Sequence, residues 1–184
     1  MARVGSPALS PDGTTVLYTV TTYDLEAFSS KTEIWSVPVA GGDARPFITS
    51  ESGSNSAPAW SPDGRRIAFV STRGGNGPQL YSLTVDGGEA LPLTNLEGGA
   101  TGPVWSPDGR RLLFTSSVTP AGDDLAARLQ AIAAGGSEAK VYDELQYRHW
   151  DEWEDGQRSH VFVLDLATGE TRDVTPGPYD APPI

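Results

Sequence analysis

A four-residue turn sequence, Ser-Pro-Asp-Gly, occurs three times in this chain of 184 residues. The copies begin at Ser10, Ser61 and Ser106, so they are 51 and 45 residues apart. Proline presets φ at the first corner of a turn, aspartate tolerates the second corner, and glycine adopts the left-handed conformation that closes the turn. Each copy therefore predicts a tight connection between two antiparallel strands, and the spacing predicts a repeat architecture.

A second repeated element follows each turn. Short runs of β-branched and aromatic residues lead into the dipeptides Gly41-Gly42, Gly87-Gly88 and Thr168-Gly169, and another short strand-like run follows each dipeptide. Such dipeptides suit two-residue hairpins. Each unit thus contains two hairpins, and four strands at this period are typical of a propeller blade. We predict an all-β fold, a β-propeller of four-stranded antiparallel blades, with blade 1 over residues 5–50, blade 2 over 56–97 and blade 3 over 101–176.

Residues 177–184 align with the first strand of blade 2, so we expect them to begin a fourth blade. Three blades form an open arc with unpaired sheet edges, whereas propellers close with about 4–8 blades. We therefore expect the chain to be part of a longer protein. The alternative is a complete three-blade chain that closes by self-association.

Blade 3 contains an insertion over residues 117–159, where the other blades have a short loop. Asp123-Asp124 can cap a short amphipathic helix with apolar side chains at Leu125, Leu129 and Ile132, and Gly135-Gly136 can end it. The following segment, residues 141–156, concentrates four aromatic residues and six carboxylates. These aromatic side chains can pack the insertion onto the blade, or they can form an acidic, aromatic-walled ledge that binds an amine.

Charge and composition exclude several classes of function. The net charge of −11 makes nucleic acid and anionic membranes unsuitable partners. The chain has no cysteine, and its two histidines, His149 and His160, are too few for a metal site. We expect His160 to begin a strand, with its ring packed or solvated. We also expect a soluble protein without cofactor or metal, since there is no signal-peptide run and no apolar segment of ~20 residues. The compartment stays open.

The blade sequence from Trp60 to Phe69, Trp-Ser-Pro-Asp-Gly-Arg-Arg-Ile-Ala-Phe, resembles the repeat of TolB-type propellers. It equally resembles the N-terminal propeller of the prolyl oligopeptidase family (S9) of serine peptidases. The insertion distinguishes the two, because Val-Tyr-Asp-Glu-Leu-Gln-Tyr-Arg-His-Trp-Asp at 141–151 resembles the acylaminoacyl-peptidase and dipeptidyl-peptidase branch of that family. Residues 156–163 and 175–180 extend this resemblance, which covers essentially the whole chain.

The resemblance implies a serine peptidase that cleaves short peptides near their N-terminus. In that family the propeller covers a C-terminal α/β-hydrolase domain with a Ser, Asp and His triad. This chain ends before such a domain, so we expect it to be catalytically silent and to gate access of peptides. We assign Asp151 and Glu152 as candidate ligands of a substrate's N-terminal amine, and Arg148 as a residue that orients a carboxylate or carbonyl.

Two other functions remain open. A non-enzymatic TolB-like propeller would bind a protein partner, and a sugar-binding or lyase-type propeller is a weaker possibility without a supporting motif. The sequence contains no Gly-x-Ser-x-Gly elbow, which is the usual setting of a catalytic serine in an α/β-hydrolase. The sequence downstream of the propeller would distinguish a peptidase from a binding module.

Overall fold

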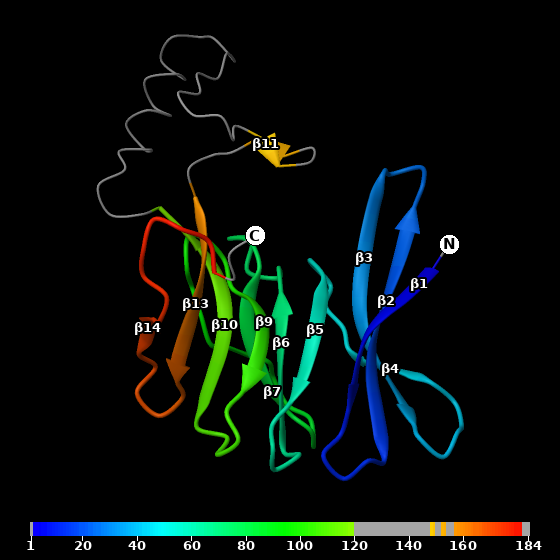
Figure 1. Ribbon diagram of the computed structural model, residues 1–184. Coiled ribbons are helices and arrows are strands. Elements are labelled where there is room, and N and C mark those ends of the chain that lie inside the picture. Colours follow the sequence, from blue (N-terminus) through cyan, green and yellow to red (C-terminus); the bar gives the residue numbers. More distant parts are fainter. Residues whose placement is uncertain (1, 120–147, 150–151, 154–156, 182–184) are drawn as a thin grey trace.

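The computed structural model describes residues 2–119, 148–149, 152–153 and 157–181. These residues form three four-stranded antiparallel sheets and one two-stranded hairpin (Figure 1). The prediction of an all-β fold built from four-stranded blades is thereby confirmed. The described residues contain no helix, and the helix predicted between Asp123 and Gly136 lies outside them.

Each sheet follows the order of its strands in the chain, because a turn or loop joins neighbouring strands. Blade 1 contains β1 (Ala2–Leu9), β2 (Thr15–Asp24), β3 (Ser29–Pro38) and β4 (Arg45–Ile48). Blade 2 contains β5 (Asn55–Trp60), β6 (Arg66–Ser71), β7 (Gln79–Thr84) and β8 (Leu91–Pro92). Blade 3 contains β9 (Thr101–Trp105), β10 (Arg111–Val118), β13 (Arg158–Asp165) and β14 (Thr171–Asp173). The separate hairpin pairs β11 (Arg148–His149) with β12 (Glu152–Trp153).

The first strand of each blade is the inner strand of the arc. β5 contacts β1 of the preceding blade and β9 of the following blade. The Ser-Pro-Asp-Gly turns lie together at one end of the blades, here called the lower end (Figure 1). The upper end carries the loops 25–28 and 72–78 and the connections between blades, 49–54 and 93–100.

A hydrogen-bond network closes each lower turn. The Ser61 hydroxyl donates to Asp63 Oδ1 at 2.6 Å and accepts from the backbone N–H of Arg66 at 2.9 Å. Asp63 Oδ1 also accepts from the N–H of Arg65 at 3.1 Å, and Gly64 has a φ of 68°. The serine-to-aspartate bond has the same length in the other two turns, from Ser10 to Asp12 and from Ser106 to Asp108. The turn that the sequence predicts from residue types is therefore held by side chains as well as by backbone conformation.

These hydrogen bonds act on the three aspartates. The serine hydroxyl, followed by a backbone N–H, lowers the pKa of Asp12, Asp63 and Asp108 below the ordinary value of 3.8. Donors that point at a carboxylate favour its ionised form. Each turn is therefore built around a charged aspartate at neutral pH.

Every inner strand has a bulge at the same place in the repeat. Ser6, Ala57 and Gly102 each precede a proline and have positive φ values of 46°, 47° and 62°. The register between the first and second strands shifts beside each of them. Three different residue types adopt this conformation, so the bulge belongs to the repeat and not to a glycine at one position.

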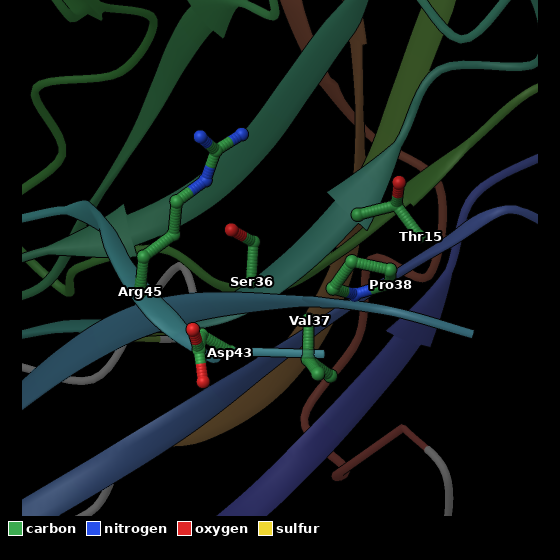
Figure 2. A pocket seen from close by; sticks show the side chains of 6 residues that line it. All are labelled: Thr15, Ser36, Val37, Pro38, Asp43 and Arg45. Carbon is green, nitrogen blue, oxygen red and sulfur yellow. The ribbon is translucent and has the colours of Figure 1, made fainter. Parts of the chain in front are cut away.

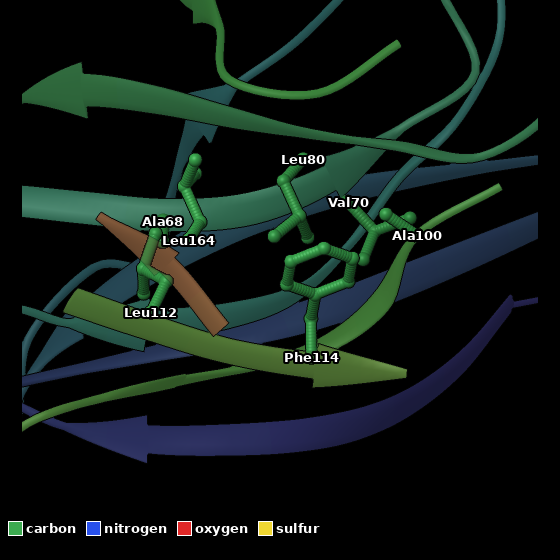
Figure 3. Packing of buried hydrophobic residues seen from close by; sticks show 7 residues of the cluster. All are labelled: Ala68, Val70, Leu80, Ala100, Leu112, Phe114 and Leu164. Carbon is green, nitrogen blue, oxygen red and sulfur yellow. The ribbon is translucent and has the colours of Figure 1, made fainter. Parts of the chain in front are cut away.

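The hydrophobic core lies between the blades and not inside any one of them. One cluster, seen in Figure 3, joins blade 2 to blade 3 and includes Leu80, Leu112 and Phe114. A second cluster joins blade 1 to blade 2. Strand β6 contributes to both: Ile67 and Phe69 pack toward blade 1, and its alternate side chains pack toward blade 3. A blade with a neighbour on each side thus buries both faces of its second strand.

A tryptophan at the end of the inner strand of blades 2 and 3 links that strand to the preceding blade. Trp60 Nε1 donates to the carbonyl of Ala8 at 3.1 Å, and Trp105 Nε1 donates to the carbonyl of Ala59 at 3.0 Å. The two acceptors occupy equivalent places in the repeat, two residues before the turn serine. The indole therefore sets the spacing between successive inner strands.

Candidate functional site at the upper end

The structure brings two of the three predicted substrate-binding residues into one hairpin. Arg148 pairs with Trp153, and His149 pairs with Glu152, across β11 and β12. The backbones of Arg148 and Glu152 are thus on neighbouring strands, at the upper end of the arc (Figure 1). Asp151 lies outside the described residues. The role of all three in binding a substrate stays a prediction.

His160 is a structural residue of β13. The residue is 2% exposed, Nδ1 lies 2.7 Å from Asp173 Oδ2, and Nε2 lies 3.0 Å from the carbonyl oxygen of Gly177. A carbonyl oxygen can only accept, so Nε2 is the donor in that bond. Of the two environments expected for this ring, packed or solvated, the structure has the packed one. Because both nitrogens are engaged, the ring joins β13 to β14 and to the segment after it.

Gln79 has the equivalent position and role in blade 2. Its amide Nε2 donates to the carbonyl of Leu96 at 2.7 Å, and Oε1 accepts from the Thr94 hydroxyl at 2.8 Å and from the Leu96 N–H at 3.0 Å. The side chain is buried. The third strand of each of these blades therefore carries, near its start, a buried polar residue that binds the segment after the fourth strand.

A cationic cluster at the upper end of blade 2 was not predicted from the sequence. The guanidinium carbon of Arg73 lies 5.4 Å from the ring centroid of Phe69 and 5.1 Å from that of Tyr81. Arg73 Nε donates to the Ser71 hydroxyl at 2.9 Å, and Nη2 donates to Asn55 Oδ1 at 2.8 Å. The cluster depends on the register that places Phe69 opposite Tyr81. This register is known only once the strands are paired, so residue spacing along the chain does not indicate it.

A hollow of about 410 Å³ lies at the lower end of blade 1 (Figure 2). Its lining includes the oppositely charged Asp43 and Arg45, together with Thr15, Ser36, Val37 and Pro38. It contains none of the residues that the sequence singles out. It also lies at the opposite end of the arc from the β11–β12 hairpin.

Two classes of site have no counterpart in the part of the chain that the structure describes. No group of three His, Cys, Asp or Glu residues there could hold a metal ion. No helix among those residues is long and apolar enough to cross a membrane.

Four-stranded antiparallel blades with their first strands side by side define a β-propeller domain. The family model PD40, the TolB beta propeller domain, matches residues 2–124, and the chain belongs to this family.

Three relatives show the range of the similarity. The chain is 36% identical over 188 residues to dipeptidyl-peptidase 5 of Porphyromonas gingivalis, covering 99% of this chain and 26% of the peptidase. It is 43% identical over 58 residues to the Tol-Pal system protein TolB of Bordetella pertussis, covering 32% of this chain and 13% of TolB. In fold, it is similar to acylaminoacyl peptidase of Pyrococcus horikoshii, with a TM-score of 0.67 and 20% identity, over 93% of this chain and 24% of that one.

The chain spans between 7% and 26% of the length of the curated peptidase and protease relatives that it matches.

Proposed function

We propose that this chain is the propeller part of a serine peptidase that hydrolyses short peptides near their N-terminus. One observation carries the proposal: similarity to a dipeptidyl-peptidase extends over 99% of the chain, and therefore through the insertion in blade 3. The similarity to TolB covers 32% of the chain. The insertion is thus shared with a peptidase, whereas the blade repeat is common to both classes.

In this proposal the propeller gates access to a catalytic site on another domain. The inner strands line the passage that a closed ring would leave at its centre, and a narrow passage admits short or unfolded peptides. The hydrolytic triad belongs to a C-terminal α/β-hydrolase domain, which is this chain's partner. The 184-residue chain by itself is then catalytically silent.

The outer face of blade 3 supports the idea that further blades follow. Leu113 is 37% exposed, whereas Leu17 and Ala68, at the same place in blades 1 and 2, are 0% exposed. Val104, two residues before the turn serine, is also exposed, and its carbonyl corresponds to the tryptophan acceptors of the two earlier blades. A fourth blade on this face would bury Leu113 as its counterparts are buried.

Peptide hydrolysis by the full-length protein is the direct test. We expect it to cleave a dipeptidyl chromogenic substrate and the 184-residue chain to leave the substrate intact. A full-length protein that is inactive on every short peptide would contradict the proposal. A Gly-x-Ser-x-Gly sequence after the last blade would support the peptidase.

The same assay tests the predicted amine ligands. Replacing Asp151 and Glu152 by Ala should raise KM about tenfold or more for peptides with a free N-terminus, since hydrogen bonds between charged groups are strong. Peptides with a blocked N-terminus should be affected much less. The matched control replaces Asp86 and Glu89, two exposed acids in the lower turn between β7 and β8. Equal effects on free and blocked peptides would show that the acids of the insertion are only surface charges.

The TolB similarity favours one alternative, a non-enzymatic propeller that binds a protein partner. A reading frame that lacks the serine elbow, together with an inactive full-length protein, would favour this alternative.

A further inference from the structure

The guanidinium of Arg73 is held by neighbouring side chains, and no carboxylate of the described residues pairs with it. Two aromatic rings and two hydrogen bonds hold its guanidinium in one orientation. Within the described part of the chain it forms no ion pair, although the protein carries a net charge of −11. A half-buried positive charge without an anion is unfavourable, because burial removes part of its hydration. An anion in contact with this guanidinium would balance its charge.

Asn55 adds a second unused donor at the same point. Its side chain is 0% exposed, and its Oδ1 accepts from both Ser71 Oγ and Arg73 Nη2. Because Arg73 can only donate, the amide oxygen must face it, and this fixes the orientation of the amide. Asn55 Nδ2 is consequently buried without an acceptor. Buried amide N–H groups nearly always have a partner, so this one is exceptional.

The unused capacity of this cluster is entirely donor capacity. A guanidinium has five N–H groups, of which Arg73 uses two in its bonds to Ser71 and Asn55. The remaining N–H groups and Asn55 Nδ2 can only donate, so the missing partner must be an acceptor. The positive charge selects an anion, and the planar fork of arginine matches the two oxygens of a carboxylate.

The cluster borders solvent on one side. Arg73 is half-buried, and residues 74–77, which follow it, are exposed. Asn55 is the first residue of the inner strand β5, so the cluster lies where the passage of a closed ring would open at the upper end. Asn55 Nδ2 is buried, so the guanidinium of Arg73 is the part of the cluster that an anion can reach from solvent.

We propose that Arg73 and Asn55 form a binding site for the carboxylate of a peptide. Arg73 is the primary ligand and donates two N–H groups to the carboxylate, while Asn55 positions the guanidinium through its Oδ1. The site adds a carboxylate-binding position on blade 2 to the amine-binding residues proposed on the insertion. It needs no hydrolysis, so its test is independent of the peptidase assay.

The test is a titration of the isotope-labelled 184-residue chain, followed through the Arg Nε–H and Asn Nδ2–H signals in nuclear magnetic resonance spectra. We expect N-acetyl-dialanine with a free carboxylate to shift the Arg73 and Asn55 signals saturably, and its C-terminal amide to shift neither. Acetate serves as a second arm: equal affinity for acetate would show that the carboxylate alone is recognised, and weaker binding of acetate would show that the peptide contributes.

Two variants make the proposal falsifiable. Arg73→Lys keeps the charge but loses the fork, and should weaken binding about tenfold or more. Asn55→Asp supplies an internal carboxylate of the same shape, so it should keep the fold and abolish binding. The matched control is Arg66→Lys, because Arg66 also stacks on an aromatic ring, that of Trp105, yet lies at the lower end. It should bind like the wild type.

Three results would overturn the site. The first is the absence of any saturable shift up to about 100 mM carboxylate, a concentration that would saturate even a millimolar site. The second is equal binding of the peptide acid and its amide. The third is undiminished binding by a folded Asn55→Asp variant. If Arg73→Lys does not fold, the acid and amide titrations of the wild type still decide the question.

Discussion

The aspartate of each lower turn is held in its ionised form by hydrogen bonds within the turn. It is fully exposed, yet its pKa is lowered by the neighbouring serine hydroxyl and then by a backbone N–H. Exposed charges in the same turns, such as Arg65 beside Asp63, contribute less than these hydrogen bonds. The turn is therefore stabilised by local geometry, which the sequence Ser-Pro-Asp-Gly carries with it wherever it occurs.

This geometry predicts a dependence of stability on pH. A carboxylate whose pKa is lower in the folded chain contributes stability above its unfolded value, and loses it as the pH falls through the folded value. We expect the urea midpoint to fall between about pH 5 and pH 2, and Asp63→Asn to have a lower midpoint at neutral pH and a flatter pH profile. Asp86→Asn, at an exposed position in another lower turn, should follow the wild type. Parallel profiles for all three proteins would contradict the assignment.

Contacts between blades combine apolar burial with a small number of specific polar bonds. Arg66 Nη2 of blade 2 donates to the carbonyl of Gly109 at 3.1 Å, and its guanidinium carbon lies 4.8 Å from the centroid of the Trp105 ring. The same indole donates to Ala59 of the preceding inner strand. Trp105 is thus bonded to blade 2 at two points. Its loss should loosen one blade interface and leave each sheet intact.

We expect Trp105→Phe to lower the free energy of unfolding by about 1 kcal/mol more than Trp35→Phe does. Both changes replace a tryptophan by phenylalanine and so remove the same atoms. Trp35 Nε1, however, is buried and has no hydrogen-bond partner among the described residues. The difference therefore reports the polar contacts of the Trp105 indole, which are the bond to the Ala59 carbonyl and the stacking of Arg66 on the ring. Equal losses of stability, measured by urea unfolding of the two variants, would show that these contacts contribute nothing.

The three blades differ in how far neighbouring blades bury them. Blade 2 has a neighbour on both sides and buries every residue of β6 after Arg66, whereas Leu113 of blade 3 remains partly exposed on the outer face. In a repeat protein each unit is stable mainly through its neighbours. The outer faces of an arc are therefore its weakest parts, and a further blade would change them most.

Two adjacent leucines test this view. In the 184-residue chain Leu112→Ala should cost about 2–5 kcal/mol, because Leu112 is fully buried against blade 2. Leu113→Ala should cost less than about 1 kcal/mol, because that side chain borders solvent. In the full-length protein the cost of Leu113→Ala should rise toward that of Leu112→Ala. An unchanged cost there would mean that no blade covers this face.

Strands, turns and blades could be predicted from the sequence because their signals are local. A turn needs four residues of particular types, and a strand needs a short run of β-branched and aromatic residues, so the repeat alone determined the four-stranded blades. Its spacing also indicated where the insertion interrupts blade 3. These features depend on neighbours along the chain, and the three four-stranded sheets of the structure agree with them.

The cluster around Arg73 was decided only by the tertiary structure. In it, Arg73 contacts side chains from three strands: Asn55, Ser71, Phe69 and Tyr81. Their spacing along the chain does not indicate that they lie close together. The same holds for His160, whose ring became a structural link once Asp173 and Gly177 were brought to it. Local conformation follows from residue type, but the charge balance of a site depends on which side chains the folded blades bring together.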